Sequence, residues 1–419
     1  MNPPRLPELI DIGKGALGRL VAYCARRSRG SRLRLVADRR TWKAMGERLE
    51  AELRAASLRT RSTIFDEPYL AADERSVLAL LVDDQVEEGL YLAVGSGTIT
   101  DIVRFVCHRT RRDFVSVATA PSVDAYSSVV APIIVDGMKR TVGAAAPIAI
   151  FAEPELLARA PRPMIAAGFG DMVCKFSAVA DWRLGALLWG ESLDEAIARR
   201  SVAAARGCVE AAADIGAARS GGVERLMAAL VESGLCMALA GHSKPASGAE
   251  HQYSHFWEMR LLREGRPPIL HGLKVGIGTL ETAGLWDAVR GMSAEDAEER
   301  LRSASLPRRT EEEALVRTAF GADAAEVLAG QERFLGMGEA EFESLKSRIA
   351  ASWAEIRELA SSVPSRAETE RLLALAGCPT QAGELGLGAE EVAAALAAAH
   401  YLRDRFTVRK LARLLGLAP

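Results

Sequence analysis

The sequence lacks the features that mark several classes of protein. No apolar run approaches the roughly 20 residues that a membrane-spanning helix needs, and the start, MNPPRLPELIDIGKG, lacks the basic-then-apolar order of a signal peptide. The six cysteines are scattered without a Cys-x-x-Cys pair, which argues against a disulfide framework and a thiolate zinc site. These absences predict a cytoplasmic protein with reduced thiols and no membrane span.

Neither sign of charge dominates the chain. Lys and Arg number 53 and Asp and Glu 55, so the net charge of -2 provides no general basic field for a phosphate backbone, and we expect no nucleic-acid partner. No repeat of 20 to 50 residues is visible. The chain does have 419 residues, 49% of them hydrophobic and 26% charged, which predicts two packed domains.

The first part of the chain alternates helical and strand patterns. Apolar residues recur at helical spacing over 15–27 and again over about 41–56. Short apolar runs at 33–37, 90–94 and 114–118 each end at a polar or Gly-, Ser- or Pro-containing segment, as strands do. This alternation predicts an α/β domain with a mainly parallel sheet that has helices on its faces.

The pattern changes near the proline pair Pro161 and Pro163. Beyond it Ala, Leu, Glu and Arg dominate, strand-like runs disappear and helical periodicity continues to Leu415. We therefore predict an α/β domain over residues 1–160 and an all-helical domain over 161–419.

A glycine turn follows the apolar run at 90–94. Gly95 and Gly97 precede a helical pattern, so backbone N–H groups at the helix start can meet a phosphate that the glycines allow to approach closely. The spacing is not G-x-G-x-x-G, and a tight turn in which Thr98 caps the helix gives the same pattern. Both interpretations remain open at this point.

A second polar turn, residues 119–124, follows the run at 114–118. Its side chains are expected at the same carboxyl edge of the sheet, where ligands bind in open α/β folds. Ser122 and Asp124 fit a ligand site there, and they equally fit turn and capping positions.

Histidine is scarce, but three of the six histidines form a cluster that predicts a metal site. His251 and His255 are four residues apart, which places both imidazoles on one face of a helix. His271 follows a proline pair and sits where a new helix is expected to begin. The first two either bind a metal together, or one binds it while the other contacts a ligand.

Asp171 is the acidic residue that best completes such a site. It lies in the largely apolar segment 166–174, where a carboxylate must be paired, protonated or bound to metal. Its other interpretation is a helix N-cap.

Asp38 closes the run at 33–37 and bears on the choice of cofactor. An acid at such a strand end accepts hydrogen bonds from the adenosine ribose and repels a 2′-phosphate, whereas Arg39 and Arg40 favour that phosphate. Asp38 is alternatively the N-cap of the helix near Thr41. The nicotinamide dinucleotide itself is implied only by the family resemblance given next, and for it we predict that NADH is preferred over NADPH.

Several segments together resemble the glycerol-1-phosphate dehydrogenases, within the superfamily of iron-containing alcohol dehydrogenases and dehydroquinate synthase. The order and spacing of these segments carry the resemblance, which extends over nearly the whole chain. The segments are GSGTITDIVRF (95–105), TAPSVDAYSS (119–128), AAGFGDMVCKFSAVADW (166–182), GAEHQYSHFWEM (248–259), ILHGLKVGIGT (269–279) and RDRFTVRKLARLLG (403–416).

The resemblance implies roles for individual residues. The metal ligands it implies are Asp171, His251 and His271, and the substrate contacts are Asp124, Asp171 and His255. The implied contacts with the nicotinamide dinucleotide are Gly97, Thr98, Ile99, Thr100, Asp101, Thr119, Ala120, Pro121, Ser122 and Ser128. Only one of the two histidines four residues apart is then a ligand.

The activity that the resemblance implies is reduction of dihydroxyacetone phosphate to sn-glycerol 1-phosphate by NAD(P)H, a step in lipid biosynthesis. It also implies one divalent metal per subunit, zinc or nickel, and a homodimer. Lys175, Arg260 and Lys274 lie near the motifs as candidate cations for the substrate phosphate. The alternatives are another small phosphorylated or phosphonate ketone as substrate, a lyase like dehydroquinate synthase, and a non-catalytic protein that kept the fold.

Overall fold

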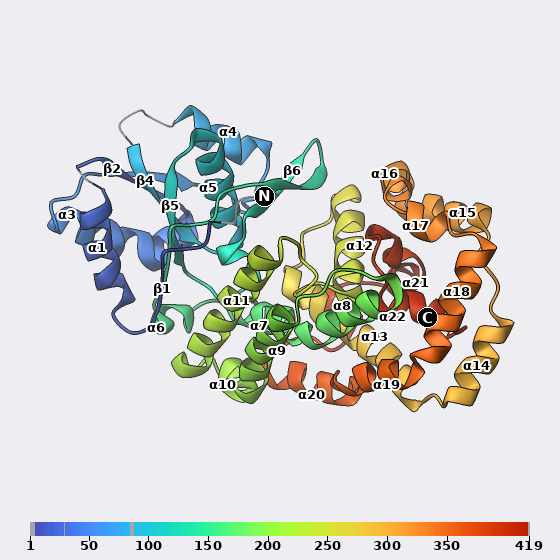
Figure 1. The fold of residues 1–419 in the computed structure, drawn as a ribbon. Coiled ribbons are helices and arrows are strands. Elements are labelled where there is room, and N and C mark those ends of the chain that lie inside the picture. The colour runs from blue at the N-terminus through green and yellow to red at the C-terminus, as the bar shows by residue number, and fades with distance from the viewer. Residues whose placement is uncertain (1–4, 29, 84–87, 418–419) are drawn as a thin grey trace. The chain divides into compact units, whose positions relative to one another are not determined.

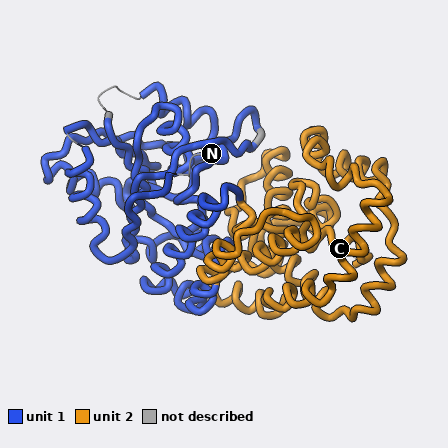
Figure 2. The backbone as a smooth tube through the Cα atoms, viewed as in Figure 1, with its two compact units in different colours: residues 1–172, 206–242 blue, residues 173–205, 243–419 orange. Residues whose placement is uncertain are grey.

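The computed structural model of the chain describes residues 5–28, 30–83 and 88–417. By its contacts the chain divides into two compact units, coloured separately in Figure 2. The first is Met1–Met172 with Arg206–His242, and the second is Val173–Ala205 with Ser243–Pro419. These limits differ from the domain boundary expected near residue 160. That boundary was placed where strand patterns give way to helical ones, and it stays a prediction.

In the described part of the first unit, six strands form one sheet in the order β1-β8-β5-β4-β2-β3, and all its pairings are parallel. Figure 1 shows the sheet in blue to green. Its strands are β1 (Leu9–Ile12), β2 (Arg32–Asp38), β3 (Thr60–Phe65), β4 (Glu88–Gly95), β5 (Asp113–Ala118) and β8 (Ala149–Ala152). The expected parallel sheet is confirmed, with the three expected strands as β2, β4 and β5.

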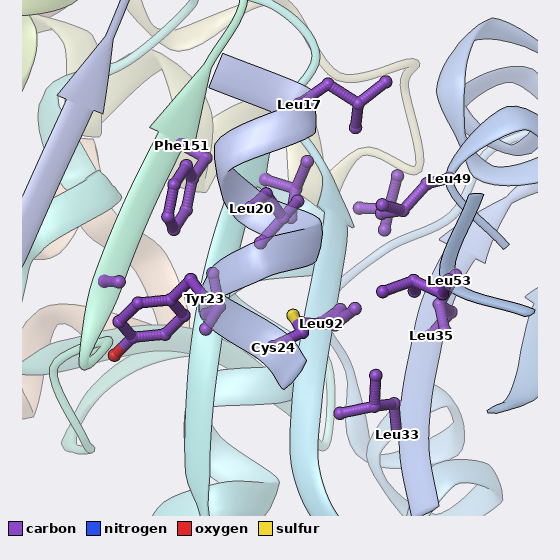
Figure 3. Packing of buried hydrophobic residues seen from close by; sticks show 14 of the residues in the cluster. Leu17, Leu20, Tyr23, Cys24, Leu33, Leu35, Leu49, Leu53, Leu92 and Phe151 are labelled. Carbon is purple, nitrogen blue, oxygen red and sulfur yellow. The ribbon is translucent and has the colours of Figure 1, made fainter. Parts of the chain in front are cut away.

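Helices cover both faces of this sheet, which explains why its central strands are continuous apolar runs. Leu90, Leu92 and Val94 of β4 pack into the cluster formed with α1 and α3, whereas Tyr91 and Ala93 pack with α4 and α5. Figure 3 shows the first cluster, in which side chains of α1 and α3 meet those of β2, β4 and β8. The helices of this unit are α1 (Ala16–Arg27), α2 (Arg39–Thr41), α3 (Glu47–Ala55), α4 (Glu74–Val82), α5 (Gly97–Thr110), α6 (Pro154–Leu157), α7 (Arg162–Val173), α10 (Ala212–Gly216) and α11 (Ser220–Ala240).

The helix expected over about 41–56 is confirmed over residues 39–55, but its turns are not uniform. A π-helical segment, Trp42–Gly46, separates α2 from α3. A Cβ on Gly46 would lie 2.3 Å from a ring carbon of Trp42, so the indole packs where any other residue would place its side chain. The glycine therefore makes room for the widened π-helical turn. The periodicity of apolar residues did not indicate this turn.

An antiparallel hairpin, β6 (Val130–Val135) and β7 (Met138–Gly143), was not expected from the sequence. Its two-residue turn is Asp136-Gly137, and both residues have positive φ, 51° and 74°. Asp-Gly is a preferred pair for this tight hairpin turn because glycine adopts positive φ without strain. The dipeptide was therefore an available signal.

The described residues of the second unit form helices joined by loops, with no strand among them, as expected for the chain beyond residue 161. Its helices are α8 (Lys175–Trp189), α9 (Glu195–Glu210, which ends in the first unit), α12 (Ala249–Arg263), α13 (His271–Gly291), α14 (Ala294–Ser303), α15 (Arg309–Phe320), α16 (Ala324–Ala329), α17 (Glu332–Leu335), α18 (Glu339–Ala351), α19 (Trp353–Ser361), α20 (Arg366–Leu375), α21 (Ala389–Ala398) and α22 (Val408–Leu414). Among all described residues of the chain, no helix combines the length and the hydropathy of a membrane span.

Candidate functional site

The glycine turn joins β4 to α5 at the carboxyl edge of the sheet. The strand ends at Gly95 and the helix begins at Gly97, with Ser96 as an N-cap that makes no side-chain cap bond. Thr98 is therefore the second helical residue, so its interpretation as the cap is wrong. The backbone N–H groups of the first turn of α5 are presented at the sheet edge, as a phosphate site requires.

The two polar turns are packed against each other at this edge. The Thr119 N–H donates to the Gly95 carbonyl at 3.1 Å, and a Cβ on Gly97 would lie 3.1 Å from a methyl of Val123. A Cβ on Gly95 would lie 2.6 Å from Ile99 in the helix that follows. Gly95 thus leaves no room for a side chain, and Gly97 lies close to Val123 of the second turn, so the two turns form one surface.

Asp38 ends β2, the strand next to β4, so it lies at the same carboxyl edge. Its Oδ1 accepts the N–H groups of Arg40 and Thr41, each at 2.8 Å, and the Thr41 hydroxyl accepts the Asp38 N–H. The N-cap interpretation is therefore confirmed. Arg39 pairs with Asp66, while Arg40 donates to the Pro68 carbonyl at 3.2 Å. A contact of Asp38 with the ribose stays a prediction.

Asp101 lies inside α5, where its carboxylate is 3.4 Å from the guanidinium of the buried Arg104. Arg104 also donates to the carbonyls of Tyr126 and Val130, which ties α5 to the segment after the second turn. Burial raises the pKa of Asp101 to about 6, although Arg104 opposes the shift. The Asp101 carboxyl group thus helps to hold α5 in place through Arg104. It also lies in the segment that we expect to bind the dinucleotide.

The Asp101→Asn variant should weaken the dependence of stability on pH. Because the folded pKa of Asp101, about 6, lies above its ordinary value of 3.8, the native state holds this proton more tightly. The contribution to stability is complete below about pH 4 and is lost as the pH rises through about 6. Between about pH 4.5 and about pH 8, the decrease in the free energy of unfolding should be smaller in the variant than in the unmutated protein by about 1 to 3 kcal/mol.

Chemical denaturation at both pH values measures this difference. Glu155→Gln, which removes an exposed carboxylate from the same unit, serves as the control and should keep the slope of the unmutated protein. An Asp101→Asn protein with that same slope would contradict the prediction.

Asp124 and Ser128 of the second turn have defined partners. Asp124 Oδ2 accepts the hydroxyl of Ser233 on α11 at 2.8 Å, and the Asp124 N–H donates to Asp171 Oδ2 at 3.1 Å. Ser128 makes a local turn with Val130, at 3.0 and 3.1 Å. Ser233 was missed in the sequence analysis, because no local pattern links a helix serine to a turn 109 residues earlier.

Asp171 is fully buried and lies within α7, two residues before its end. It cannot be an N-cap there, so that interpretation is wrong. The close packing of α7 against the second turn depends on Gly168, where a Cβ would lie 1.9 Å from the Pro121 carbonyl oxygen. One helix thus both supports the turn and carries the carboxylate expected to bind metal.

The three clustered histidines lie together in the second unit. His251 and His255 are on α12, and His271 is the first residue of α13, as expected. The ring centre of His271 is 5.2 Å from that of His251 and 5.5 Å from that of His255. The two helices approach closely at Gly278, where a Cβ would lie 2.5 Å from the Glu250 carbonyl oxygen.

Glu250 is a buried acidic residue of this site that the sequence analysis missed. Its Oε1 lies 3.0 Å from His251 Nδ1 and accepts the Gly248 N–H at 2.5 Å. Burial would raise the pKa of Glu250, but the bonds from His251 and Gly248 outweigh it, and the pKa lies below its usual value. The sequence GAEH, in which Glu250 directly precedes His251, could have indicated this residue.

Asp181 on α8 is a second buried acid that was missed. Its carboxylate accepts the Ala249 N–H at 2.8 Å and the Val408 N–H at 2.6 Å. It therefore joins the starts of α12 and α22. Burial, together with the neighbouring Glu250, raises the pKa of Asp181 well above its usual value.

Among the residues of the second unit that the structure describes, ligand atoms suited to a metal form two groups. Cys174 joins Glu250 and His251 in one, and Glu258 joins His255 and His271 in the other, with all ligand atoms of each group within 4.8 Å of one another. Imidazoles with carboxylates suit divalent metals such as zinc.

The three candidate phosphate-binding cations each have protein partners. Lys274 lies 3.3 Å from Glu258, Lys175 donates to the Ala246 carbonyl at 3.2 Å, and Arg260 donates to Glu264 at 2.8 Å. The choice among these cations stays open.

Comparison with known proteins gives consistent relatives. The profile of the iron-containing alcohol dehydrogenase family matches residues 11–161. A protein of Geobacillus stearothermophilus named glycerol-1-phosphate dehydrogenase (NAD(P)+) is 36% identical over 405 residues, which are 96% of this chain and 91% of that protein. A protein of the same name from Bacillus subtilis strain 168 is 35% identical, over 97% of this chain and 90% of that protein.

Solved structures support the fold independently. The structure of a probable glycerol dehydrogenase from Sinorhizobium meliloti 1021 has a TM-score of 0.60 with this chain, at 18% sequence identity. The match covers 99% of this chain and 97% of the other. At such low identity the similarity concerns the fold alone.

Proposed function

The chain belongs to the family of NAD(P)-dependent glycerol-1-phosphate dehydrogenases, and we propose that it reduces dihydroxyacetone phosphate to sn-glycerol 1-phosphate at a divalent metal. The metal ligands that we propose are Asp171, His251 and His271. The main support for the metal site is the pair of imidazoles of His251 and His271, whose ring centres lie 5.2 Å apart. The buried carboxylate of Glu250 lies 3.0 Å from Nδ1 of His251.

The donor set fits a divalent metal. Two imidazoles and one carboxylate give the mixed nitrogen and oxygen ligands of catalytic zinc and related sites, which keep a position open for substrate. Asp171 and His251 are buried and His271 is partly buried. Both zinc and nickel remain candidates for the metal.

A metal bound there supplies a Lewis acid for the ketone oxygen, and a bound nicotinamide supplies the hydride. His255 lies one helical turn after His251 on α12, and we propose that it, or a water it orders, gives the proton to that oxygen. Asp124, fixed by the Ser233 hydroxyl, and Asp171 contact the substrate as well. No covalent nucleophile is needed.

The cofactor site that we propose is the carboxyl edge of the sheet in the first unit. Its support is the pair of packed turns and the start of α5, where backbone N–H groups suit a pyrophosphate. The residues proposed to line it are Asp38, Gly95, Gly97, Thr98, Ile99, Thr100, Asp101, Thr119, Ala120, Pro121, Ser122 and Ser128.

A stopped assay of the purified protein tests this function. The protein is incubated with NADH, a panel of ketone phosphates and phosphonates, and added Ni²⁺ or Zn²⁺, and the product is separated on a chiral phase. We expect turnover of dihydroxyacetone phosphate to the sn-1 isomer. In the reverse direction, with NAD⁺ as the hydride acceptor, we expect glycerol 1-phosphate to be oxidised. Oxidation of glycerol 3-phosphate under these conditions, with glycerol 1-phosphate inert, would overturn the proposal.

We expect NADH to be preferred over NADPH, and Asp38→Ala to narrow the preference. The change removes a carboxylate that can accept hydrogen bonds from the ribose hydroxyls of NADH and that repels the 2′-phosphate of NADPH. It also removes a cap, which costs about 1 kcal/mol of stability. The measurement is kcat/KM with each cofactor.

Asp73→Ala is the matched control for the lost cap. Asp73 caps α4 with the same reciprocal arrangement, its carboxylate accepting the Ser76 N–H at 2.8 Å. That variant should keep the cofactor preference of the unmutated protein. A higher kcat/KM with NADPH in the unmutated protein would show that Arg39 and Arg40 decide instead.

We also propose a cytoplasmic homodimer. The support is the family resemblance for the dimer and the scattered cysteines for the reducing compartment. Light scattering that gives a monomer mass at micromolar concentration would count against the dimer.

A further inference from the structure

Glu250 is held in place on every side by groups of the second unit. Its side chain is fully buried, with Oε1 bound to the Gly248 N–H and to His251 Nδ1. Oε2 lies 3.0 Å from the hydroxyl of Ser177 on α8. The carboxylate therefore has one position, set by its neighbours.

This arrangement selects one nitrogen of His251. Glu250 Oε1 accepts the Gly248 N–H and faces His251 Nδ1 at 3.0 Å, so this oxygen is placed to accept a hydrogen bond from Nδ1 as well. In that tautomer Nε2 has the lone pair. We propose that Glu250 is a positioning residue for metal binding: it fixes the ring orientation of His251 and strengthens Nε2 as the donor atom. This inference rests on the metal site proposed above.

Helix capping alone does not account for Glu250. The start of α12 already has a cap, because Asp181 accepts the Ala249 N–H. Gly248 lets both acids close on it, since a Cβ there would lie 2.6 Å from Asp181 Oδ2 and 2.9 Å from Glu250 Oε2. A second buried carboxylate at one helix start is costly unless it has partners, and besides the Gly248 N–H these are the Ser177 hydroxyl and the His251 imidazole.

Glu391 provides a matched control elsewhere in the same unit. Its Oε2 accepts the Gly388 N–H at 2.8 Å at the start of α21, and its side chain is largely buried. Its other side-chain partners are the guanidinium groups of Arg266, at 2.7 Å, and Arg260, at 3.8 Å, rather than a histidine. Glu391→Gln therefore alters a buried capping carboxylate without altering an imidazole.

The test measures metal binding by the full-length metal-free protein at one fixed pH. Zn²⁺ affinity is obtained by competition with a chromophoric chelator, and the visible absorption of added Co²⁺ reports ligand geometry. We expect Glu250→Ala to bind Zn²⁺ about 10- to 100-fold more weakly, with an altered Co²⁺ spectrum, and Glu250→Gln about 10-fold more weakly because the charge is lost. Glu391→Gln should match the unmutated protein.

Equal Zn²⁺ affinity and equal Co²⁺ spectra for the Gln variants at positions 250 and 391 would overturn the inference. If Glu250→Ala does not fold, Glu250→Gln still decides, because it keeps the size of the side chain. Absence of Zn²⁺ and Co²⁺ binding in the unmutated protein would instead reject the metal site itself, and this inference with it.

Discussion

Replacing His271 with alanine should abolish both metal binding and turnover. The change removes one of three proposed ligands while leaving α13 intact, because His271 is only partly buried at its first position. Loss of the Lewis acid costs several kcal/mol of transition-state stabilisation, so kcat/KM should fall about 10³-fold or more. Metal content by elemental analysis and kcat/KM should fall together, and chelation of the unmutated protein should have the same effect.

Two other histidine variants make this result specific. His108→Ala removes an exposed histidine of α5 and should change neither metal content nor rate. His255→Ala should retain the metal but lose rate, since we assign His255 to proton transfer rather than ligation. A fully active, metal-free His271→Ala protein would refute the ligand assignment, and loss of metal from His255→Ala would make His255 a ligand.

The strands that the sequence predicted are those whose environment matches their composition. β2, β4 and β5 are central and have helices on both faces, so each is a continuous apolar run. β3 lies at an edge and is mostly polar (TRSTIF), and β1 and β8 are only four residues long. Such segments become strands through pairing with neighbours, which local composition does not encode.

The candidate site shows the same division between local and distant causes. The spacing of His251 and His255, and the start of a helix at His271, are local features and could be predicted. The role of Glu250 depends on Ser177, 73 residues earlier, and that of Asp124 on Ser233, 109 residues later. Partners this far apart meet only through tertiary packing, so no spacing along the chain indicates them.

Gly168→Ala is the second change with a large expected effect. The added Cβ would lie 1.9 Å from the Pro121 carbonyl oxygen and 3.2 Å from Leu230, and the nearest atom is backbone that cannot rotate away. Overpacking of this kind costs about 1 to 3 kcal/mol, and sometimes more. The free energy of unfolding should fall by at least this amount.

The same substitution should disturb ligand binding, because the displaced groups belong to the proposed site. Pro121 lies in the turn expected to contact the dinucleotide, and the Asp124 N–H in that turn bonds Asp171 on the helix of Gly168. A shift of α7 away from the turn therefore disturbs both the proposed dinucleotide site at Pro121 and the position of Asp171. We expect weaker NADH binding, measured by fluorescence titration, in the fraction of protein that remains folded.

Gly207→Ala is the control that separates steric overlap from helix propensity. Gly207 lies in α9, and outside the backbone of its own helix turns no atom of another residue comes within 4 Å of the position that an added methyl group would take. Alanine there should therefore add up to about 1 kcal/mol of stability. The two variants make the same chemical change in two helices, and we expect opposite signs in denaturant unfolding. If Gly168→Ala is as stable as Gly207→Ala and binds NADH normally, then α7 does not depend on close contact with the turn, and the link from that turn to Asp171 is not rigid.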